Sequence, residues 1–159
     1  MRKQPIFVAV DTNNIKRATQ IVNATNKYIY GVKFGLEFFC SKGGREAVKK
    51  FKNKNVKIFL DLKLKDIPNT VYKAIKSLKD VSPDYLTIHA SGGLEMMKAA
   101  KKAQSETNKK LKILAVTINL TNKQRFKTNG IKNKCRISST KTCANCKKSK
   151  NSWNSLLSA

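Results

Sequence analysis

Three charged residues follow one apolar run at a spacing that could support chemistry: Asp61, Lys63 and Asp66. The run before them, residues 56–60, carries β-branched and aromatic side chains and predicts a buried strand. Side chains alternate along a strand, so we expect Asp61 and Lys63 to point the same way and Asp66 to lie in the following turn. Charges at the end of a buried strand are costly unless they are paired. The set is typical of a reaction centre, although a surface ion-pair ladder would have the same spacing.

Five apolar runs predict the strands that position these residues: 6–10, 28–34, 56–61, 85–89 and 111–118. Apolar residues at helical spacing predict helices between them, in segments 15–22, 36–51, 68–80 and 94–103. Strands that alternate with helices indicate a parallel sheet with right-handed crossovers, and so the α/β class. Polar residues stand at or near the carboxyl end of each strand: Asp11, Lys33, Asp61, His89 and Thr117. This distribution predicts the top face of a (β/α) barrel, since a doubly wound sheet would use one switch point with a glycine-rich turn.

The chain has 159 residues and a formal net charge of +25. Such a charge suits acidic ligands, nucleic acid or membrane surfaces. The lysines are spread along the chain, however, which favours a solvated lysine-rich surface over a nucleic-acid interface. The sequence contains no apolar stretch near the roughly 18 residues of a membrane span and no secretory signal pattern. Only one of the four cysteines, Cys40, lies in the first half, so we expect a reducing, cytoplasmic location.

The whole string of residues 61–70, DLKLKDIPNT, resembles the signature of the orotidine 5′-phosphate decarboxylase family. Two earlier stretches, VAVD at 8–11 and GVKFG at 31–35, are similar to strand ends of that family in the same order. The stretches HASGG at 89–93 and AVT at 115–117 resemble its fourth and fifth strand ends, and the likeness covers residues 5–122. The resemblance implies a TIM-type (β/α) barrel. It also implies decarboxylation of orotidine 5′-monophosphate to UMP in pyrimidine biosynthesis, without a metal or organic cofactor.

The resemblance also implies a role for each matching residue. Lys63 would stabilise the carbanion at C6 of the pyrimidine and deliver the proton that replaces CO₂, and Asp61 would sit beside the substrate carboxylate. Lys33 would orient the charged network and touch the ribose. The other residues that it assigns to the catalytic or substrate-binding set are Asp11 at a ribose hydroxyl, Asp66, Ile67 and Thr70 in the site of a neighbouring subunit, and Thr121 at the fifth strand exit. A homodimer with shared sites is therefore expected.

The sequence divides into a partial barrel at 1–122 and a basic tail at 123–159. The tail has ten Lys or Arg residues and no Asp or Glu, so we expect an irregular, poorly ordered segment. It holds Cys135, Cys143 and Cys146, but a single C-x-x-C pair lacks the second ligand pair of a structural zinc site. We hypothesise that the reading frame slips near residue 122. Five of eight strand units would leave the barrel incomplete and without the family's phosphate-binding loops, and so impair activity.

Two other functions fit part of the sequence. A sugar-phosphate decarboxylase of the 3-keto-gulonate 6-phosphate type shares the D-x-K-x-x-D spacing but uses magnesium, and the IPNT stretch at 67–70 argues against it. A non-catalytic, basic nucleic-acid-binding protein would fit the charge, although no aromatic-rich basic motif supports it. The single histidine, His89, is read as a packed strand-end residue rather than a general base.

Overall fold

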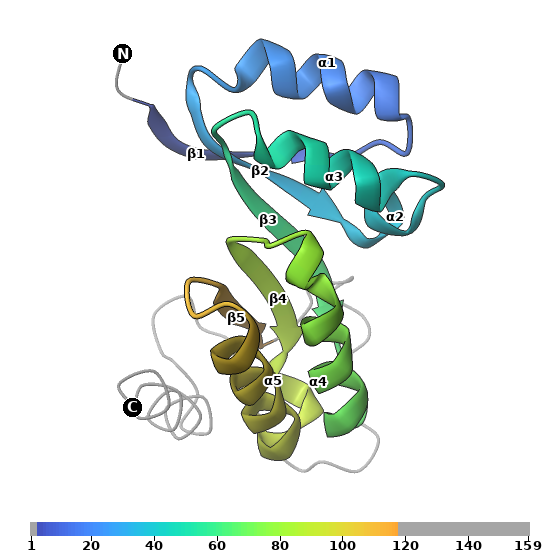
Figure 1. Cartoon of the computed structure of the whole chain (residues 1–159), viewed down its shortest axis with the longest axis vertical. Coiled ribbons are helices and arrows are strands. Elements are labelled where there is room, and N and C mark those ends of the chain that lie inside the picture. The colour runs from blue at the N-terminus through green and yellow to red at the C-terminus, as the bar shows by residue number, and fades with distance from the viewer. Residues whose placement is uncertain (1–2, 118–159) are drawn as a thin grey trace, which may run out of the picture. The chain divides into compact units, whose positions relative to one another are not determined.

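The computed structural model describes residues 3–117, which lie in one compact unit, Met1–Asn119 (Figure 1). Its strands are β1 (Gln4–Val10), β2 (Ile29–Gly35), β3 (Lys57–Leu64), β4 (Tyr85–His89) and β5 (Lys112–Val116). Its α-helices are α1 (Ile15–Thr25), α2 (Leu36–Cys40), α3 (Gly44–Lys52), α4 (Pro68–Ser77) and α5 (Leu94–Thr107). Short 3₁₀ turns follow α4 at Leu78–Asp80 and β4 at Ala90–Gly92. Thr121, Cys135, Cys143, Cys146 and the predicted tail lie outside the described residues.

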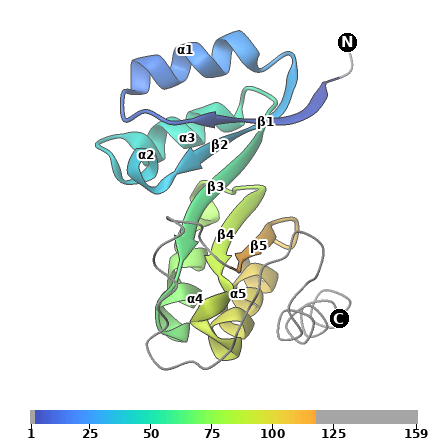
Figure 2. The ribbon, with the colours of Figure 1, turned by 180° about the vertical axis from the view of Figure 1, so that it is seen from behind.

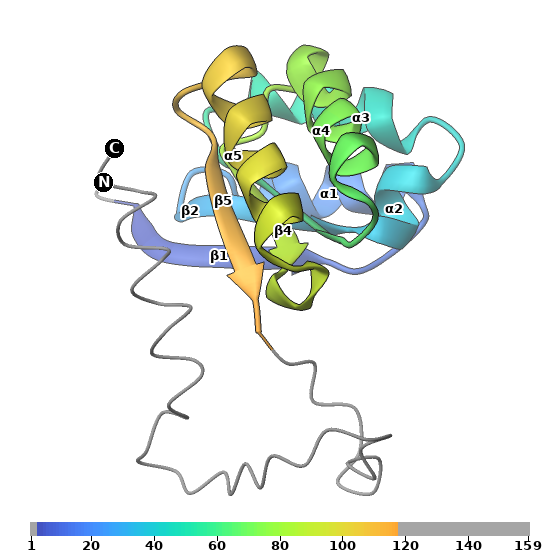
Figure 3. The same ribbon diagram turned by 90° about the horizontal axis from the view of Figure 1, so that it is seen from below.

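The strands form one parallel sheet in the order β1-β2-β3-β4-β5 (Figure 2). Each crossover moves one strand further in the same direction, which is the path of a (β/α) barrel, whereas a doubly wound sheet reverses its order. The helices lie on one face of the sheet (Figure 3). The predicted α/β class and partial barrel architecture are therefore confirmed, with five strand units in the described part.

The core lies between the sheet and the helices. On β3, Ile58, Leu60 and Leu62 are buried, while the alternate residues Phe59 and Asp61 face the other side and are half-buried. The helices contribute matching apolar stripes. On α4 the buried residues are Val71 and Ile75, four positions apart, so both lie on the same face of the helix. This two-sided pattern places the charged residues of β3 on the face that the helices leave open.

The open face also carries an aromatic cluster, which lies nearer the amino ends of the strands than the charged residues do. The ring of Phe7 makes edge-to-face contacts with Tyr30, Phe59 and Tyr85, at centroid distances of 5.4, 5.5 and 5.2 Å. Gly31 lies beneath this ring, and a Cβ atom there would collide with it. In a closed barrel this face of the sheet is the packed interior.

Two of the differences between the predicted and observed elements concern the segments next to the charged residues. The expected helix over 36–51 is two helices, α2 and α3, because Gly43 has a left-handed φ of 78° and turns the chain between them. Gly44 then lies against the carbonyl oxygen of Phe38, where a Cβ would collide. The third strand was expected to end at Asp61, but it continues to Leu64 and includes Lys63. No helix within residues 3–117 is long and apolar enough to cross a membrane.

Candidate active site

Three charged side chains meet near the carboxyl ends of β2 and β3. The Asp61 Oδ2 atom lies 2.8 Å from Lys63 Nζ and 3.2 Å from Lys33 Nζ. The Asp61 side chain is 13% exposed, whereas those of Lys33 and Lys63 are 36% and 38% exposed. The parallel register explains the meeting, because Lys33 pairs with Phe59, two residues before Asp61 and on the same face. The carboxylate is the buried centre of the cluster, and a ligand can reach both ammonium groups.

Lys63 has an unusual backbone conformation for a lysine in a strand. Its φ is 50°, in the left-handed region that L-residues with a Cβ rarely adopt. The conformation coincides with an irregularity in the sheet, since Leu60 pairs with Leu86 of β4 but the next pair is Leu64 with Ile88. Three residues of β3 therefore lie opposite one residue of β4. This bulge sets the direction of the Lys63 side chain.

Thr87 on β4 is the residue opposite the bulge. Its hydroxyl donates a hydrogen bond of 2.9 Å to Asp61 Oδ1 and accepts one of 2.9 Å from the Lys63 backbone N–H. Thr87 was not among the site residues predicted from the sequence. The available signal was its place two residues before His89, on the strand face shared with the charged cluster.

The environment of Asp61 favours its ionised form. Burial by itself raises the pKa of this carboxyl group, but hydrogen bonds from Lys63, Thr87 and Lys33 outweigh it and hold the pKa below its ordinary value. Two lysines beside one ionised aspartate leave a single surplus positive charge in the cluster. The arrangement thus combines attraction for an anionic ligand with a fixed carboxylate next to that ligand.

The structure does not bring every predicted site residue into this cluster. Asp11 directly follows β1 and is exposed, and His89 is half-buried at the end of β4. Asp66 is exposed in the loop between β3 and α4, where its Oδ1 accepts a 2.7 Å hydrogen bond from the backbone N–H of Ile67. Among residues 3–117, Asp66 forms no ion pair. Ile67 is 67% exposed and Thr70 is exposed in the first turn of α4.

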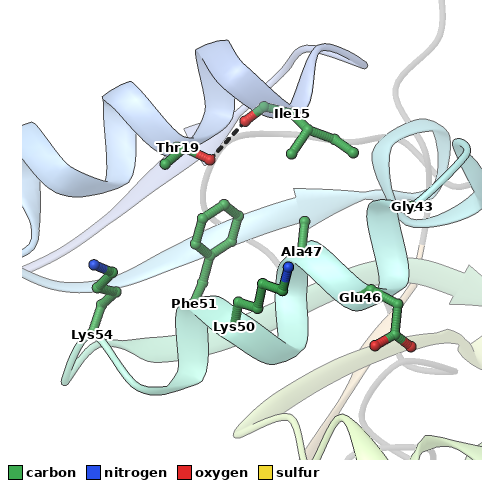
Figure 4. A pocket seen from close by; sticks show the side chains of 8 residues that line it. All are labelled: Ile15, Thr19, Gly43, Glu46, Ala47, Lys50, Phe51 and Lys54. Atoms are coloured by element: carbon green, nitrogen blue, oxygen red, sulfur yellow. Dashed lines mark hydrogen bonds between the residues drawn. The ribbon is translucent and has the colours of Figure 1, made fainter.

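A separate cavity of about 530 Å³ lies between α1 and α3 (Figure 4). Its walls include Ile15 and Thr19 of α1 and Ala47 and Phe51 of α3, and it does not include a residue of the charged cluster. Within the part of the chain that the structure describes, no three His, Cys, Asp or Glu side chains gather as a metal site would require.

The parallel sheet has its strands in chain order, with the helices on one face and a charged cluster at the carboxyl ends of its strands. These features define a partial (β/α)-barrel protein with a candidate enzymatic site. Comparison with known families gives the particular group. The chain belongs to the Orotidine 5′-phosphate decarboxylase / HUMPS family, whose sequence model matches residues 4–150. The resemblance stated from the motifs is confirmed, and the family match continues past residue 122.

Individual relatives agree with the family. The chain is 41% identical over 114 residues to an orotidine 5′-phosphate decarboxylase of Sphingopyxis alaskensis, covering 72% of this chain and 49% of the relative. It is 38% identical over 117 residues to that of Malacoplasma penetrans, covering 74% and 50%. The chain spans about half the length of the curated relatives it matches.

Solved structures show the same relationship. The orotidine 5′-phosphate decarboxylase of Lactobacillus acidophilus matches with a TM-score of 0.64 and 34% identity, over 74% of this chain and 55% of the other. The orotidine 5′-monophosphate decarboxylase of Methanocaldococcus jannaschii, complexed with the inhibitor BMP, matches with a TM-score of 0.63 and 27% identity, over 70% and 52%.

Proposed function

We propose that this chain carries the reaction centre of an enzyme that decarboxylates orotidine 5′-monophosphate to UMP. The observation that carries the proposal is the Asp61 carboxylate held between the ammonium groups of Lys33 and Lys63 at 3.2 and 2.8 Å. The cluster lies at the strand ends where (β/α) barrels place their chemistry. Membership of the decarboxylase family supports the choice of reaction and of substrate.

Each charged residue has a role that its position supports. Asp61 lies beside the substrate carboxylate and disfavours its negative charge before CO₂ leaves. Lys63 stabilises the carbanion that forms at C6 and then gives it a proton. Lys33 holds Asp61 from the neighbouring strand and contacts the ribose, and Asp11 contacts a ribose hydroxyl.

Magnitudes separate these contributions. Two carboxylates about 4 Å apart repel by roughly 4 kcal/mol at an effective dielectric constant near 20. Enzymes generally lower barriers by about 8–23 kcal/mol, so repulsion from Asp61 supplies only part of the effect. The larger part falls to Lys63, whose charge is in place before the carbanion develops.

The proposed enzyme is a homodimer with shared sites. Asp66, Ile67 and Thr70 are all exposed around the loop from β3 to α4, as residues that reach into a partner's site must be. Thr121, proposed to contact substrate, lies outside the described residues. We propose a cytoplasmic location, with which the free thiol of Cys40 is compatible.

Release of labelled CO₂ from carboxyl-labelled orotidine 5′-monophosphate by the purified chain tests the function. We expect Lys63→Ala to lower turnover by about 10²- to 10⁴-fold, the usual contribution of a proton-transferring group, with an unchanged fold. The matched control is Lys65→Ala, which removes an exposed lysine two residues away and should keep wild-type turnover. Appreciable turnover by Lys63→Ala would remove that residue from its role.

A sugar-phosphate decarboxylase is the second candidate, because the matched family description includes the HUMPS group. Enzymes of the 3-keto-gulonate 6-phosphate type use magnesium, whereas the proposed reaction needs no metal. Turnover of 3-keto-gulonate 6-phosphate that a chelator abolishes, with no turnover of orotidine 5′-monophosphate, would decide for this alternative.

A further inference from the structure

Thr87 differs in burial from the other polar residues of the chain. Among residues 3–117 it is the sole polar or charged residue that is buried, at 5% exposure. Its neighbours on β4, Leu86 and Ile88, point into the helix-covered core, so Thr87 points to the opposite face, where the charged cluster lies. A hydroxyl that is taken out of water needs hydrogen-bond partners, and those partners show what it does.

Both hydrogen-bonding capacities of the Thr87 hydroxyl are used within the cluster. The hydroxyl donates a hydrogen bond to Asp61 Oδ1. The hydroxyl oxygen also accepts a hydrogen bond from the backbone N–H of Lys63, and both bonds are 2.9 Å long. The other Asp61 oxygen, Oδ2, receives the ammonium groups of Lys33 and Lys63. One hydroxyl thus connects the carboxylate of Asp61 to the backbone of Lys63.

The bulge in β3 explains why this connection matters. Residues 61–63 lie opposite Thr87 alone, and Lys63 has the unfavourable left-handed backbone. A strained conformation of this kind persists only when surrounding contacts determine it. The hydrogen bond from Lys63 N–H to Thr87 fixes the backbone, and the ion pair with Asp61 fixes the side chain.

We propose that Thr87 is a positioning residue that sets the Asp61 carboxylate and the Lys63 backbone in one geometry. Its effect on catalysis rests on the proposed function, because Thr87 acts through Asp61 and Lys63. Its effect on the geometry of Asp61 and Lys63 is independent of the proposed function. In an active enzyme, loss of the hydroxyl lowers kcat and leaves KM nearly unchanged, since Thr87 does not hold the substrate.

The experiment compares Thr87→Val with Thr87→Ser in the full chain. Valine has the shape of threonine without the hydroxyl, and serine keeps the hydroxyl. NMR gives two measurements on each variant: the pKa of the Asp61 carboxyl group and the hydrogen-exchange rate of the Lys63 amide. We expect Thr87→Val to raise the pKa of Asp61 toward its ordinary value and to speed Lys63 exchange about tenfold, as for loss of one buried hydrogen bond. Thr87→Ser should keep both near wild type.

Ile88→Val is the matched control. It trims a fully buried side chain on the same strand but on the opposite face, so it loosens the core without touching the cluster. It should leave the Asp61 pKa and the Lys63 exchange rate as in the wild type. If Thr87→Val does not fold, Thr87→Ala replaces it for the same two measurements.

Wild-type values for both measurements in Thr87→Val would overturn the proposal, and so would equal changes in Thr87→Val and Thr87→Ser. A chain that releases no CO₂ in any form would instead contradict the proposed function, and the two NMR measurements would still decide the role of Thr87. If the chain is active, a kcat near wild type in Thr87→Ser and a lowered kcat in Thr87→Val would support both the proposed function and the role of Thr87.

Discussion

Lys63 combines an ion-paired ammonium group with an unfavourable backbone conformation. The left-handed region costs an L-residue about 1–2 kcal/mol, and Lys63 adopts it with a φ of 50°. The residue also supplies the ammonium group that lies 2.8 Å from Asp61. Strain at such a position is typical of functional sites, where geometry is kept at the expense of stability.

Two substitutions of Lys63 that differ in backbone strain test this interpretation. Lys63→Ala and Lys63→Gly both delete the ammonium group, but glycine accepts a positive φ without steric cost. We expect Lys63→Gly to be more stable than Lys63→Ala, with a free energy of unfolding about 1 kcal/mol higher, measured by urea denaturation. As a control, glycine should be the less stable of the pair at Lys57, an ion-paired β3 residue without a positive φ. The same order at both sites would rule out strain at Lys63.

Asp84 connects the amino ends of three neighbouring strands, β3, β4 and β5. Its carboxylate accepts hydrogen bonds from the ammonium groups of Lys52 in α3 and Lys57 in β3, at 2.8 and 2.9 Å. It also accepts one from the backbone N–H of Ile58 at 3.0 Å. Its backbone carbonyl accepts the N–H of Lys112 in β5. Burial alone raises the pKa of Asp84, but the hydrogen bonds from Lys52, Ile58 and Lys57 outweigh it and hold the pKa below the ordinary 3.8.

Acid should therefore destabilise the fold through Asp84. Because the unfolded chain binds this proton more readily, the contribution of Asp84 is complete above its unfolded pKa of 3.8 and is lost as the pH falls through the lower folded value. We expect Asp84→Asn to cost about 1–3 kcal/mol at pH 7 and to reduce the loss of stability below pH 3.8, measured by denaturation across pH. The more exposed Asp80→Asn should cost less than about 1 kcal/mol. Equal costs for the two variants would contradict this role of Asp84.

The cavity between α1 and α3 leaves space in the packing of these two helices. Thr19 of α1 lines it, and its hydroxyl donates a 2.8 Å hydrogen bond back to the Ile15 carbonyl in the same helix (Figure 4). From α3, Ala47 and Phe51 point toward α1, which leaves a largely apolar space facing a small polar side chain.

Filling this cavity should stabilise the chain. Thr19→Leu adds apolar volume where Ala47 and Phe51 can contact it and replaces a weaker helix former. We expect a gain of about 1 kcal/mol in the free energy of unfolding, measured by thermal and urea denaturation. Gln20→Leu, an exposed position on the same helix, should change stability by less than about 0.5 kcal/mol. A gain at Gln20 equal to that at Thr19 would show that the cavity is not the cause.

The described sheet has open edges. Within residues 3–117, β1 and β5 each pair with a single strand, and a barrel closes only when its edge strands are paired. The open face also presents Tyr30 and Leu114, which are 37% and 41% exposed. The described unit therefore has the charged cluster at its strand ends without the closed interior that a complete barrel would form around it.

The proposed shared sites predict complementation between defective subunits. Lys63→Ala and Asp66→Ala chains each lack one residue of every site. In a mixed dimer, one of the two sites keeps both residues, so an equal mixture should regain about a quarter of wild-type CO₂ release. The control is each variant alone, which should stay inactive after the same mixing treatment. Mixed dimers that form without recovered turnover, from an active parent, would exclude sharing of Asp66 between subunits.

The element order and most of the charged cluster could be predicted from local sequence patterns. Apolar periodicity is a local property, so it located all five strands and placed Lys33 and Asp61 on strands. Strand alternation then predicted that Asp61 and Lys63 share a face, and the 2.8 Å ion pair agrees with it. The ordered motifs also gave the family, because each motif stands at a strand end.

The contacts that hold the cluster in place could not be predicted, because they depend on how distant segments pack. The bulge at residues 61–63 depends on the register between β3 and β4, which no local pattern specifies. For the same reason the predicted strand ended at Asp61, and the left-handed conformation of Lys63 was not predicted. Thr87 is an ordinary strand residue in sequence. It becomes part of the site because the fold buries its hydroxyl between a carboxylate and a backbone N–H that both need a partner.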